Sequence, residues 1–164
     1  MCIHITPLDK GENIRREICL YLEEMGINIE SSHHEQGPGQ NEIGFKYSDA
    51  LSSADNFLTF KSAVKAIAAR NGLFASFMPK PLPNAPGSGL HINLSLIKNG
   101  LNIFDGSDDF IANSFIAGIL ARIKEITLFL NPLCNSYDRF GKFEAPKYVS
   151  WSHQNRSQLI RIPA

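Results

Sequence analysis

The sequence predicts an α+β fold for this chain of 164 residues. Residues 48–70 and 108–130 carry apolar side chains at helical spacing. Shorter segments around them alternate apolar with polar residues, as half-buried strands do. Hydrophobic residues make up 43% of the chain, which is sufficient for one folded domain with a core. No internal repeat or low-complexity segment interrupts this pattern.

A first helix is expected over residues 9–25. Its apolar side chains recur at helical spacing and are Ile14, Ile18, Leu22 and Met25. Gly26 follows them, and glycine suits the left-handed turn that ends many helices. Residues 27–31 then alternate apolar and polar side chains, which predicts a half-buried strand. Further strands are expected over residues 73–78 and 90–97, and within residues 148–162.

The two long helices are predicted to pack in the core. The first contains the apolar residues Leu51, Phe57, Val64 and Ile67. It closes at Asn71-Gly72, a pair that favours a helix end. The second begins with Asp108-Asp109, where two carboxylates face the positive end of the helix dipole. Its apolar stripe consists of Ile111, Phe115, Ile119, Ile123, Ile126 and Leu130.

Composition excludes several classes of protein. Lys and Arg number 16, as do Asp and Glu, so the basic excess expected of a nucleic-acid-binding protein is missing. Cys2, Cys19 and Cys134 are odd in number and lack metal-type spacing, which favours a reducing compartment, most simply the cytoplasm. No apolar run reaches the roughly 20 residues of a membrane span, and no signal peptide follows Met1. We therefore expect a soluble protein without membrane partners.

The most informative segment is residues 33–42, which concentrates two histidines, two carboxylates and a glycine-rich turn. Hard cations such as Mg²⁺ prefer oxygen ligands. Glu35 and Glu42 lie on either side of a Gly-Pro-Gly turn and could converge on one such ion. The alternative is a solvated acidic loop, because exposed His and Glu residues are common on protein surfaces.

A second segment, residues 80–91, contains three prolines and two glycines that hold the backbone out of regular structure. If residues 90–97 are extended, the period of side chains along a strand places three polar residues on one face. These are His91, Asn93 and Ser95. They could form the wall of a site, or they could face water as the polar side of an amphipathic strand. The Gly87-Ser88-Gly89 run matches neither the phosphate loop nor the dinucleotide fingerprint.

The third segment, residues 131–164, spaces three arginines and a glutamate among turn residues: Arg139, Glu144, Arg156 and Arg161. Arginine carries a permanent charge on a planar fork of donors, which suits carboxylate and phosphate ligands. Surface salt bridges are the alternative for each arginine taken alone.

Together the three segments resemble the middle part of the catalytic domain of glutamine synthetases, of the type I-like group, over nearly the whole chain. The matching runs begin at PLDKGENIRREICLYLEEMGINIESSHHEQGPGQNEIGF, continue with FMPKPLPNAPGSGLHINLSLIKNG, and end with NPLCNSYDRFGKFEAPKYVSWSHQNRSQLIRIPA. The resemblance implies an antiparallel sheet with helices packed outside it, here incomplete. Residues 1–164 would then form a partial catalytic domain that lacks the family's N-terminal β-rich domain and C-terminal part.

The resemblance also implies which residues hold metal. Glu35 and Glu42 match the carboxylates of the ion on the glutamate side, and His91 matches the histidine ligand of the ion that bridges the nucleotide phosphates. The expected ions are Mg²⁺ or Mn²⁺. The residues that match the family's ATP contacts are Glu30, Asn93, Ser95, Arg156 and Arg161. A second histidine is common in the family at the position of Asn93.

The same likeness identifies the substrate-binding residues as Gly87, Arg139 and Glu144. Arg139 matches the arginine that binds the substrate carboxylate, and Glu144 the flap glutamate that closes the site, so both are catalytic candidates. Two features depart from the family pattern. Pro86 occupies a position where asparagine usually helps to hold glutamate, and the loop after Arg139 is one residue shorter than in the best-known bacterial members.

An enzyme of this family phosphorylates the γ-carboxylate of glutamate with ATP, and ammonia then displaces phosphate from γ-glutamyl phosphate. Its partners are glutamate, ammonia and ATP, with neither nucleic acid nor membrane, and the parent enzyme is a large homo-oligomeric ring. We expect the isolated chain to be inactive, because part of each metal shell is missing. Two alternatives stay open: a relative that joins glutamate to another amine, and a non-catalytic remnant with a binding or structural role.

Overall fold

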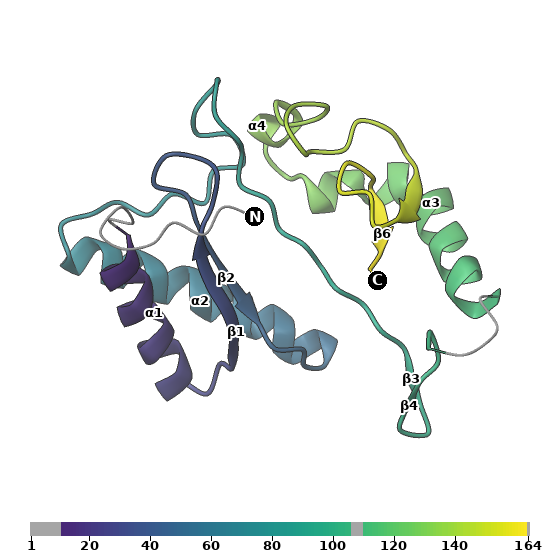
Figure 1. The fold of residues 1–164 in the computed structure, drawn as a ribbon, viewed down its shortest axis with the longest axis horizontal. Helices are drawn as coiled ribbons and strands as arrows, with labels where there is room; N and C mark the ends of the chain where they lie inside the picture. Colours follow the sequence, from purple (N-terminus) through teal and green to yellow (C-terminus); the bar gives the residue numbers. More distant parts are fainter. Residues whose placement is uncertain (1–10, 106–109, 164) are drawn as a thin grey trace. The chain divides into compact units, whose positions relative to one another are not determined.

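The computed structural model describes residues 11–105 and 110–163. They form two compact units (Figure 1). The first unit extends to Phe77 and includes Pro83–Ser88, and the second consists of Met78–Leu82 and the chain from Gly89 onward. Helices and strands occur in both units, so the predicted α+β class is confirmed.

The first unit contains two helices and a hairpin: α1 (Glu12–Glu24), β1 (Ile29–His34), β2 (Asn41–Phe45) and α2 (Ala50–Arg70). Gly26 has a φ of +84°, so α1 ends in the left-handed turn that the sequence predicts. At the start of α2, the Asp49 side chain accepts a hydrogen bond from Ser52 N at 3.0 Å. This cap satisfies a helix donor that would otherwise lack a partner.

The core of the first unit lies where both helices meet the hairpin (Figure 1). Its buried residues are Ile18, Leu22, Ile27 and Ile67. Leu22 is fully buried, and burial of a leucine side chain contributes about 1.5–3 kcal/mol. Phe45 of β2 packs edge-on against Phe60 of α2, with ring centroids 5.0 Å apart. The hairpin is thereby held against a rigid helical support.

The second unit contains the remaining elements: β3 (Ile97–Lys98), β4 (Leu101–Asn102), α3 (Phe110–Leu130), α4 (Cys134–Tyr137), β5 (Trp151–His153) and β6 (Ile160–Ile162). Ile116 and Ile123 of α3 are buried, and the pairing of β5 with β6 confirms the strand predicted within residues 148–162. The expected helix start at Asp108-Asp109 lies outside the described residues, as does Cys2.

Two strand predictions are wrong in the described structure. Residues 73–78 form no strand, and of residues 90–97 only Ile97 pairs, in β3. Residues 90–96 are exposed on both alternating faces, including the apolar Leu90 and Ile92 at 62% each. The alternating pattern of residues 90–97 gives one polar and one apolar face. A strand also needs a neighbouring strand whose backbone N–H and C=O groups pair with its own. Within the described residues, Leu96 O accepts a hydrogen bond from Ile103 N at 2.8 Å, but no strand pairs with residues 90–95.

Among residues 11–105 and 110–163, no helix is both long enough and apolar enough to cross a bilayer.

Candidate functional site

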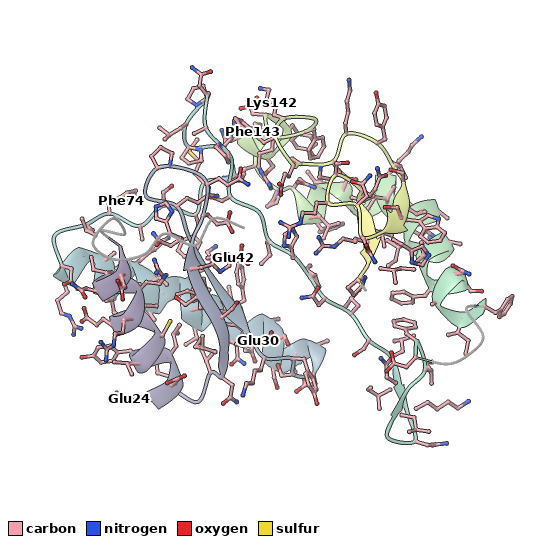
Figure 2. All side chains as sticks on the ribbon, in the orientation of Figure 1. Glu24, Glu30, Glu42, Phe74, Lys142 and Phe143 are labelled. Carbon is pink, nitrogen blue, oxygen red and sulfur yellow. The ribbon has the colours of Figure 1, made fainter. Side chains whose placement is uncertain are left out.

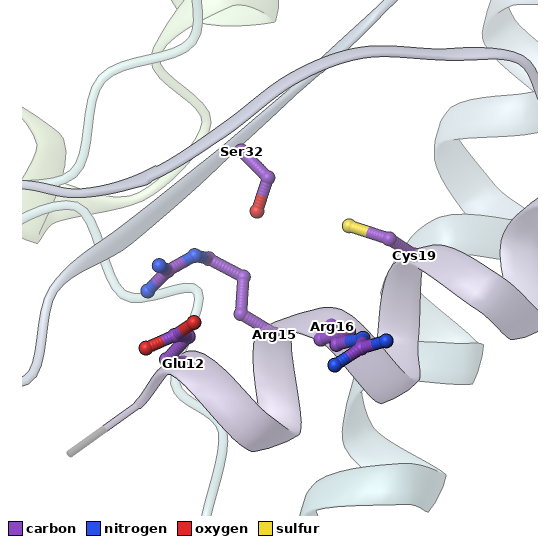
Figure 3. A pocket seen from close by; sticks show the side chains of 5 residues that line it. All are labelled: Glu12, Arg15, Arg16, Cys19 and Ser32. Atoms are coloured by element: carbon purple, nitrogen blue, oxygen red, sulfur yellow. The ribbon is translucent and has the colours of Figure 1, made fainter. Parts of the chain in front are cut away.

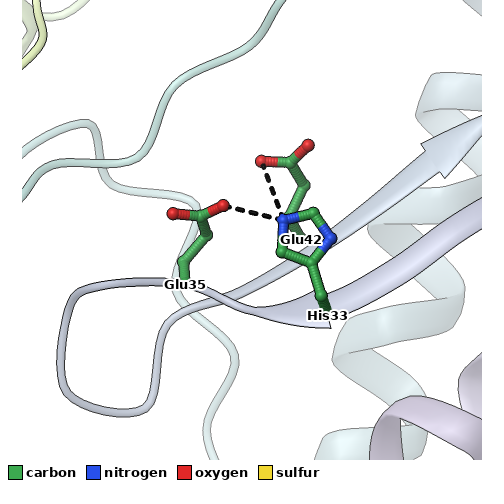
Figure 4. A group of neighbouring side chains, drawn as sticks. All are labelled: His33, Glu35 and Glu42. Carbon is green, nitrogen blue, oxygen red and sulfur yellow. Dashed lines mark hydrogen bonds and ion pairs between the residues drawn. The ribbon is translucent and has the colours of Figure 1, made fainter. Parts of the chain in front are cut away.

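The β1–β2 hairpin brings three possible metal ligands together (Figure 4). His33 Nε2 lies 2.8 Å from Glu35 Oε1 and 4.0 Å from Glu42 Oε2. One ligand atom from each of the three side chains falls within 4.8 Å of the other two. The convergence of Glu35 and Glu42 that the sequence suggests is therefore present.

The register of the hairpin explains this convergence. His33 pairs directly with Glu42, so the two side chains are cross-strand neighbours on one face. Glu35 follows the last residue of β1, and its backbone N donates to Gln40 O at 2.8 Å across the turn. The register of the strands and the turn thus place the three side chains near one another.

The charge of Glu35 suits a cation. Partial burial would raise its pKa, but hydrogen bonds from His33 and from Gln36 N outweigh this effect and hold the pKa below its ordinary value. Glu35 is therefore ionised at neutral pH. A cation that bound all three groups would need an unprotonated His33 Nε2, and it would replace the hydrogen bond between His33 and Glu35.

The cluster is only partly shielded from water. The side chains of His33 and Glu35 are 35% and 31% exposed, and that of Glu42 is 46% exposed. The exposure of Glu42 also fits a solvated acidic loop. His33 was not predicted as a metal ligand from the sequence. Its position opposite Glu42 indicates this role only once the register of the hairpin is known. His91 belongs to the second unit, and its role as a metal ligand stays a prediction.

Gly87, a predicted substrate-binding residue, lies in the same unit as the hairpin. Its carbonyl oxygen accepts a hydrogen bond from Gln40 Nε2 at 3.1 Å. The loop that carries Gly87 is therefore tied to the turn that carries Glu35. Gln40 was not singled out from the sequence, because its partner is 47 residues away.

In the second unit, Arg139 is half-buried, and burial lowers the pKa of its guanidinium. Its Nε is buried and has no hydrogen-bond partner within the described residues. Its Nη2 lies 3.3 Å from the point where a Cβ on Gly89 would stand, so that glycine leaves room for the guanidinium. A buried donor without a partner is uncommon, and a carboxylate ligand would satisfy it.

The chain around Arg139 is braced by Lys80, which is only 5% exposed. Lys80 N donates to Asn135 Oδ1 at 2.6 Å, and Asn135 Nδ2 donates back to Lys80 O at 3.0 Å. The Lys80 ammonium lies 4.5 Å from the centroid of the Phe143 ring, next to the predicted flap residue Glu144. A buried cation thus steadies the loop that carries two predicted substrate residues.

The five residues predicted to bind the nucleotide are all exposed: Glu30, Asn93, Ser95, Arg156 and Arg161. Glu30 lies in β1 and Arg161 in β6, whereas Asn93 and Ser95 lie in the unpaired segment before β3. Within the described residues no ion pair joins Arg139, Arg156 or Arg161 to a carboxylate, so the salt-bridge alternative is not realised there.

A separate pocket of about 300 Å³ lies beside α1 and is lined by Glu12, Arg15, Arg16, Cys19 and Ser32 (Figure 3). Arg15 is buried in its wall, and Nη1 donates to Asn41 Oδ1 at 2.7 Å. The pocket contains none of the predicted site residues. Its wall supports the hairpin through Asn41, the first residue of β2.

Comparisons with known proteins identify the class to which this arrangement belongs. The family model for the catalytic domain of glutamine synthetase matches residues 1–164. Glutamine synthetase from Clostridium saccharobutylicum is 54% identical over 98% of the chain, and that from Methanosarcina mazei is 51% identical over 97%. The chain spans 38% and 37% of the length of these two relatives.

Solved structures show the same fold. A glutamine synthetase chain from Plasmodium falciparum superposes with a TM-score of 0.92 at 38% identity, over 97% of this chain and 32% of that one. A chain of GmaS without ligand gives a TM-score of 0.85 at 33% identity, over 98% and 39%. This chain belongs to the glutamine synthetase catalytic-domain family, and its fold is the one predicted from the sequence.

Proposed function

We propose that the chain forms part of an enzyme that ligates ammonia to the γ-carboxylate of glutamate with ATP, through γ-glutamyl phosphate. The observation that carries this proposal is the cluster of His33, Glu35 and Glu42 on one hairpin, within a chain of the glutamine synthetase family. Ammonia is the proposed acceptor because the relatives from Clostridium saccharobutylicum and Methanosarcina mazei are named glutamine synthetase.

The hairpin residues fit a divalent cation such as Mg²⁺ or Mn²⁺, since two carboxylates and an imidazole supply oxygen and nitrogen donors. A bound cation would neutralise charge on the transferring phosphoryl group. Glu35 and Glu42 would hold it, with Glu35 kept ionised by its hydrogen bonds. His91 is the proposed ligand of a second ion.

Substrate binding is proposed for the second unit and for Gly87. Arg139 would bind the glutamate carboxylate through its buried Nε, which has no partner in the described structure. Glu144 is exposed on the loop after Arg139, and it would close over the acyl phosphate, exclude water and accept a proton from ammonium.

Nucleotide binding is proposed for Glu30, Asn93, Ser95, Arg156 and Arg161. One similar solved chain is that of GmaS in complex with ADP, which superposes with a TM-score of 0.84 at 32% identity, over 94% of this chain and 38% of that one. The exposed arginines would face the phosphates, for which their forked donors are suited. ATP is then a substrate, and the intact enzyme is expected to be a large homo-oligomer.

The free thiols of Cys19 and Cys134 support a cytoplasmic location.

Calorimetric titration of this chain with Mg²⁺, followed by ATP, tests the proposal. Glu42→Ala should weaken Mg²⁺ binding at least about tenfold, because loss of even an outer-shell partner of a metal typically costs about 10–100-fold in affinity. Glu24→Ala is the matched control, because Glu24 is an exposed glutamate on α1 (Figure 2). Equal binding by both variants, or no binding by the unmodified chain, would favour a non-catalytic role for the fold.

The 164-residue polypeptide alone is proposed to lack ligase activity, because it spans only about two-fifths of the length of its relatives. An assay of glutamine formation from ATP, glutamate and ammonium tests this directly. Turnover above the buffer rate would contradict the proposal that other parts of the family's catalytic domain are needed. Product formed only with another amine would favour the relative with a different acceptor.

A further inference from the structure

Gln40 uses both ends of its side chain and both of its backbone groups. The side-chain Oε1 accepts a hydrogen bond from Gly37 N at 3.0 Å, and Nε2 donates to Gly87 O at 3.1 Å. The backbone N of Gln40 donates to Gly37 O at 3.0 Å, and its carbonyl accepts from Glu35 N at 2.8 Å. One residue therefore joins the turn that carries Glu35 to the loop that carries Gly87.

The turn is shaped around this amide. Gly37 is buried, and a Cβ on it would stand 2.5 Å from Oε1 of Gln40, closer than two such atoms can approach. Gly39 has a φ of +66°, a conformation that side chains disfavour. These two glycines let the turn fold back so that the Gln40 amide reaches both Gly37 and Gly87.

We propose that Gln40 is a positioning residue that couples cation binding on the hairpin to the placement of the Gly87 carbonyl in the substrate loop. This inference rests on the proposed function, in which Glu35 holds the cation and Gly87 faces the substrate. A cation that replaces the hydrogen bond between His33 and Glu35 changes the position of Glu35. The Glu35 backbone is bonded to Gln40, so the change reaches Gly87 through the Gln40 amide.

The coupling requires an amide at position 40. A glutamine side chain accepts a hydrogen bond at one end and donates one at the other. Glu at this position could still accept from Gly37 N, but an ionised carboxylate cannot donate to Gly87 O. Gln40→Glu therefore breaks one link and keeps side-chain length and the other link.

Gln36→Glu is the matched control. It introduces the same charge in the same turn, and the Gln36 side chain is exposed and makes no hydrogen bond in the part of the chain that the structure describes. Any effect of added negative charge on cation affinity will appear in both variants. An effect specific to the link with Gly87 will appear only in Gln40→Glu.

Amide NMR of ¹⁵N-labelled chain during a Mg²⁺ titration measures the coupling, because the Ser88 N–H shares a peptide group with the Gly87 carbonyl. The Ser88 signal should shift with Mg²⁺ in the unmodified chain and in Gln36→Glu. In Gln40→Glu the shift should disappear. The Mg²⁺ affinity of Gln40→Glu should stay within about fivefold of that of Gln36→Glu, because a fivefold change is the lower end of typical coupling between two sites. A Ser88 shift that persists in Gln40→Glu would overturn the inference.

A second measurement separates this inference from the proposed function. If the unmodified chain binds no Mg²⁺, or if Gln40→Glu abolishes binding, the heteronuclear ¹⁵N NOE of Ser88 is compared without metal. Loss of the Gln40 link should lower this NOE in Gln40→Glu and leave it unchanged in Gln36→Glu. Equal NOE values in the two variants would overturn the positioning role. Gln40→Met, whose side chain cannot donate a hydrogen bond and accepts one only weakly, replaces Gln40→Glu if the charged variant does not fold.

Discussion

Arg15 of α1 donates a hydrogen bond from Nη1 to Oδ1 of Asn41, at 2.7 Å, and so ties the first helix to the first residue of β2. Asn41 pairs with His34 in the hairpin and precedes Glu42, one of the three clustered ligands. The support of the candidate metal site therefore includes a buried cation on the neighbouring helix.

Arg15→Ala should destabilise the chain by about 1–3 kcal/mol, because Arg15 is buried and its loss leaves Asn41 without this donor. Urea unfolding followed by circular dichroism measures the change. Arg16→Ala is the control, since Arg16 is exposed and its removal should change the free energy of unfolding by no more than about 0.5 kcal/mol. Equal losses in both variants would show that the hydrogen bond to Asn41 does not matter.

Arg139→Met should behave in the opposite way. The Arg139 Nε is buried without a partner in the described structure, and burial of an unsatisfied donor costs about 1–3 kcal/mol. Methionine removes that cost and keeps apolar contacts, so the melting temperature of the ligand-free chain should stay equal or rise. A fall in the melting temperature of Arg139→Met would mean that Arg139 stabilises the ligand-free fold, which would contradict an unsatisfied donor at this position.

Glu17 links α1 to the end of α2, where it accepts hydrogen bonds from Arg70 and from Asn71. These bonds lower the pKa of Glu17 from its ordinary value of 4.5. A carboxylate with a lowered pKa in the folded state stabilises the fold above its unfolded pKa, and this contribution disappears as the pH falls through the folded value.

Glu17→Gln should consequently lower the urea midpoint at pH 7, and the difference from the unmodified chain should shrink as the pH falls below 4.5. Glu24→Gln, on the same helix, is the control, because the exposed Glu24 side chain has no hydrogen bond or ion pair within the described residues. A difference for Glu17→Gln that is independent of pH would contradict the role given to its charge.

Gly118→Ala should stabilise the second unit by about 1 kcal/mol, because Gly118 lies inside α3 and a Cβ there would meet nothing within 4 Å. Gly100→Ala is the contrasting variant, since Gly100 has a φ of +78° in the turn between β3 and β4 and alanine should destabilise it. Thermal unfolding of both variants checks the pair. Destabilisation by Gly118→Ala would show that α3 is packed more tightly there than described.

The sequence predicts those parts of the fold that local signals determine. Gly26 ends α1 and Asn71-Gly72 ends α2 as expected, because these residue types favour helix ends whatever surrounds them. The strand expected at residues 90–97 is different, since its formation depends on a partner strand. Alternating side chains such as Leu90 and His91 cannot indicate whether that partner is present.

The candidate site follows the same division. The residues Gly-Pro-Gly between Glu35 and Glu42 predict a turn, and a turn there predicts that the two carboxylates approach each other. His33 joins them only through the hairpin register, which no single residue specifies. Gln40 and Gly87 are 47 residues apart, with β2 and α2 between them, so their hydrogen bond depends on tertiary structure. The roles of His91 and of the residues that match the family's ATP contacts stay predictions.

We propose that His33, Glu35 and Glu42 together hold a divalent cation, and pulsed EPR of the Mn²⁺-loaded chain can detect the imidazole in its coordination shell. The measurement is made on a chain that carries His91→Gln, so that the proposed second ion contributes no imidazole. Nitrogen modulation from a coordinated imidazole should appear in this chain and after the further change His34→Gln, and it should disappear after the further change His33→Gln. Absence of nitrogen modulation from bound Mn²⁺ while His33 is present, or its persistence after His33→Gln, would contradict the claim.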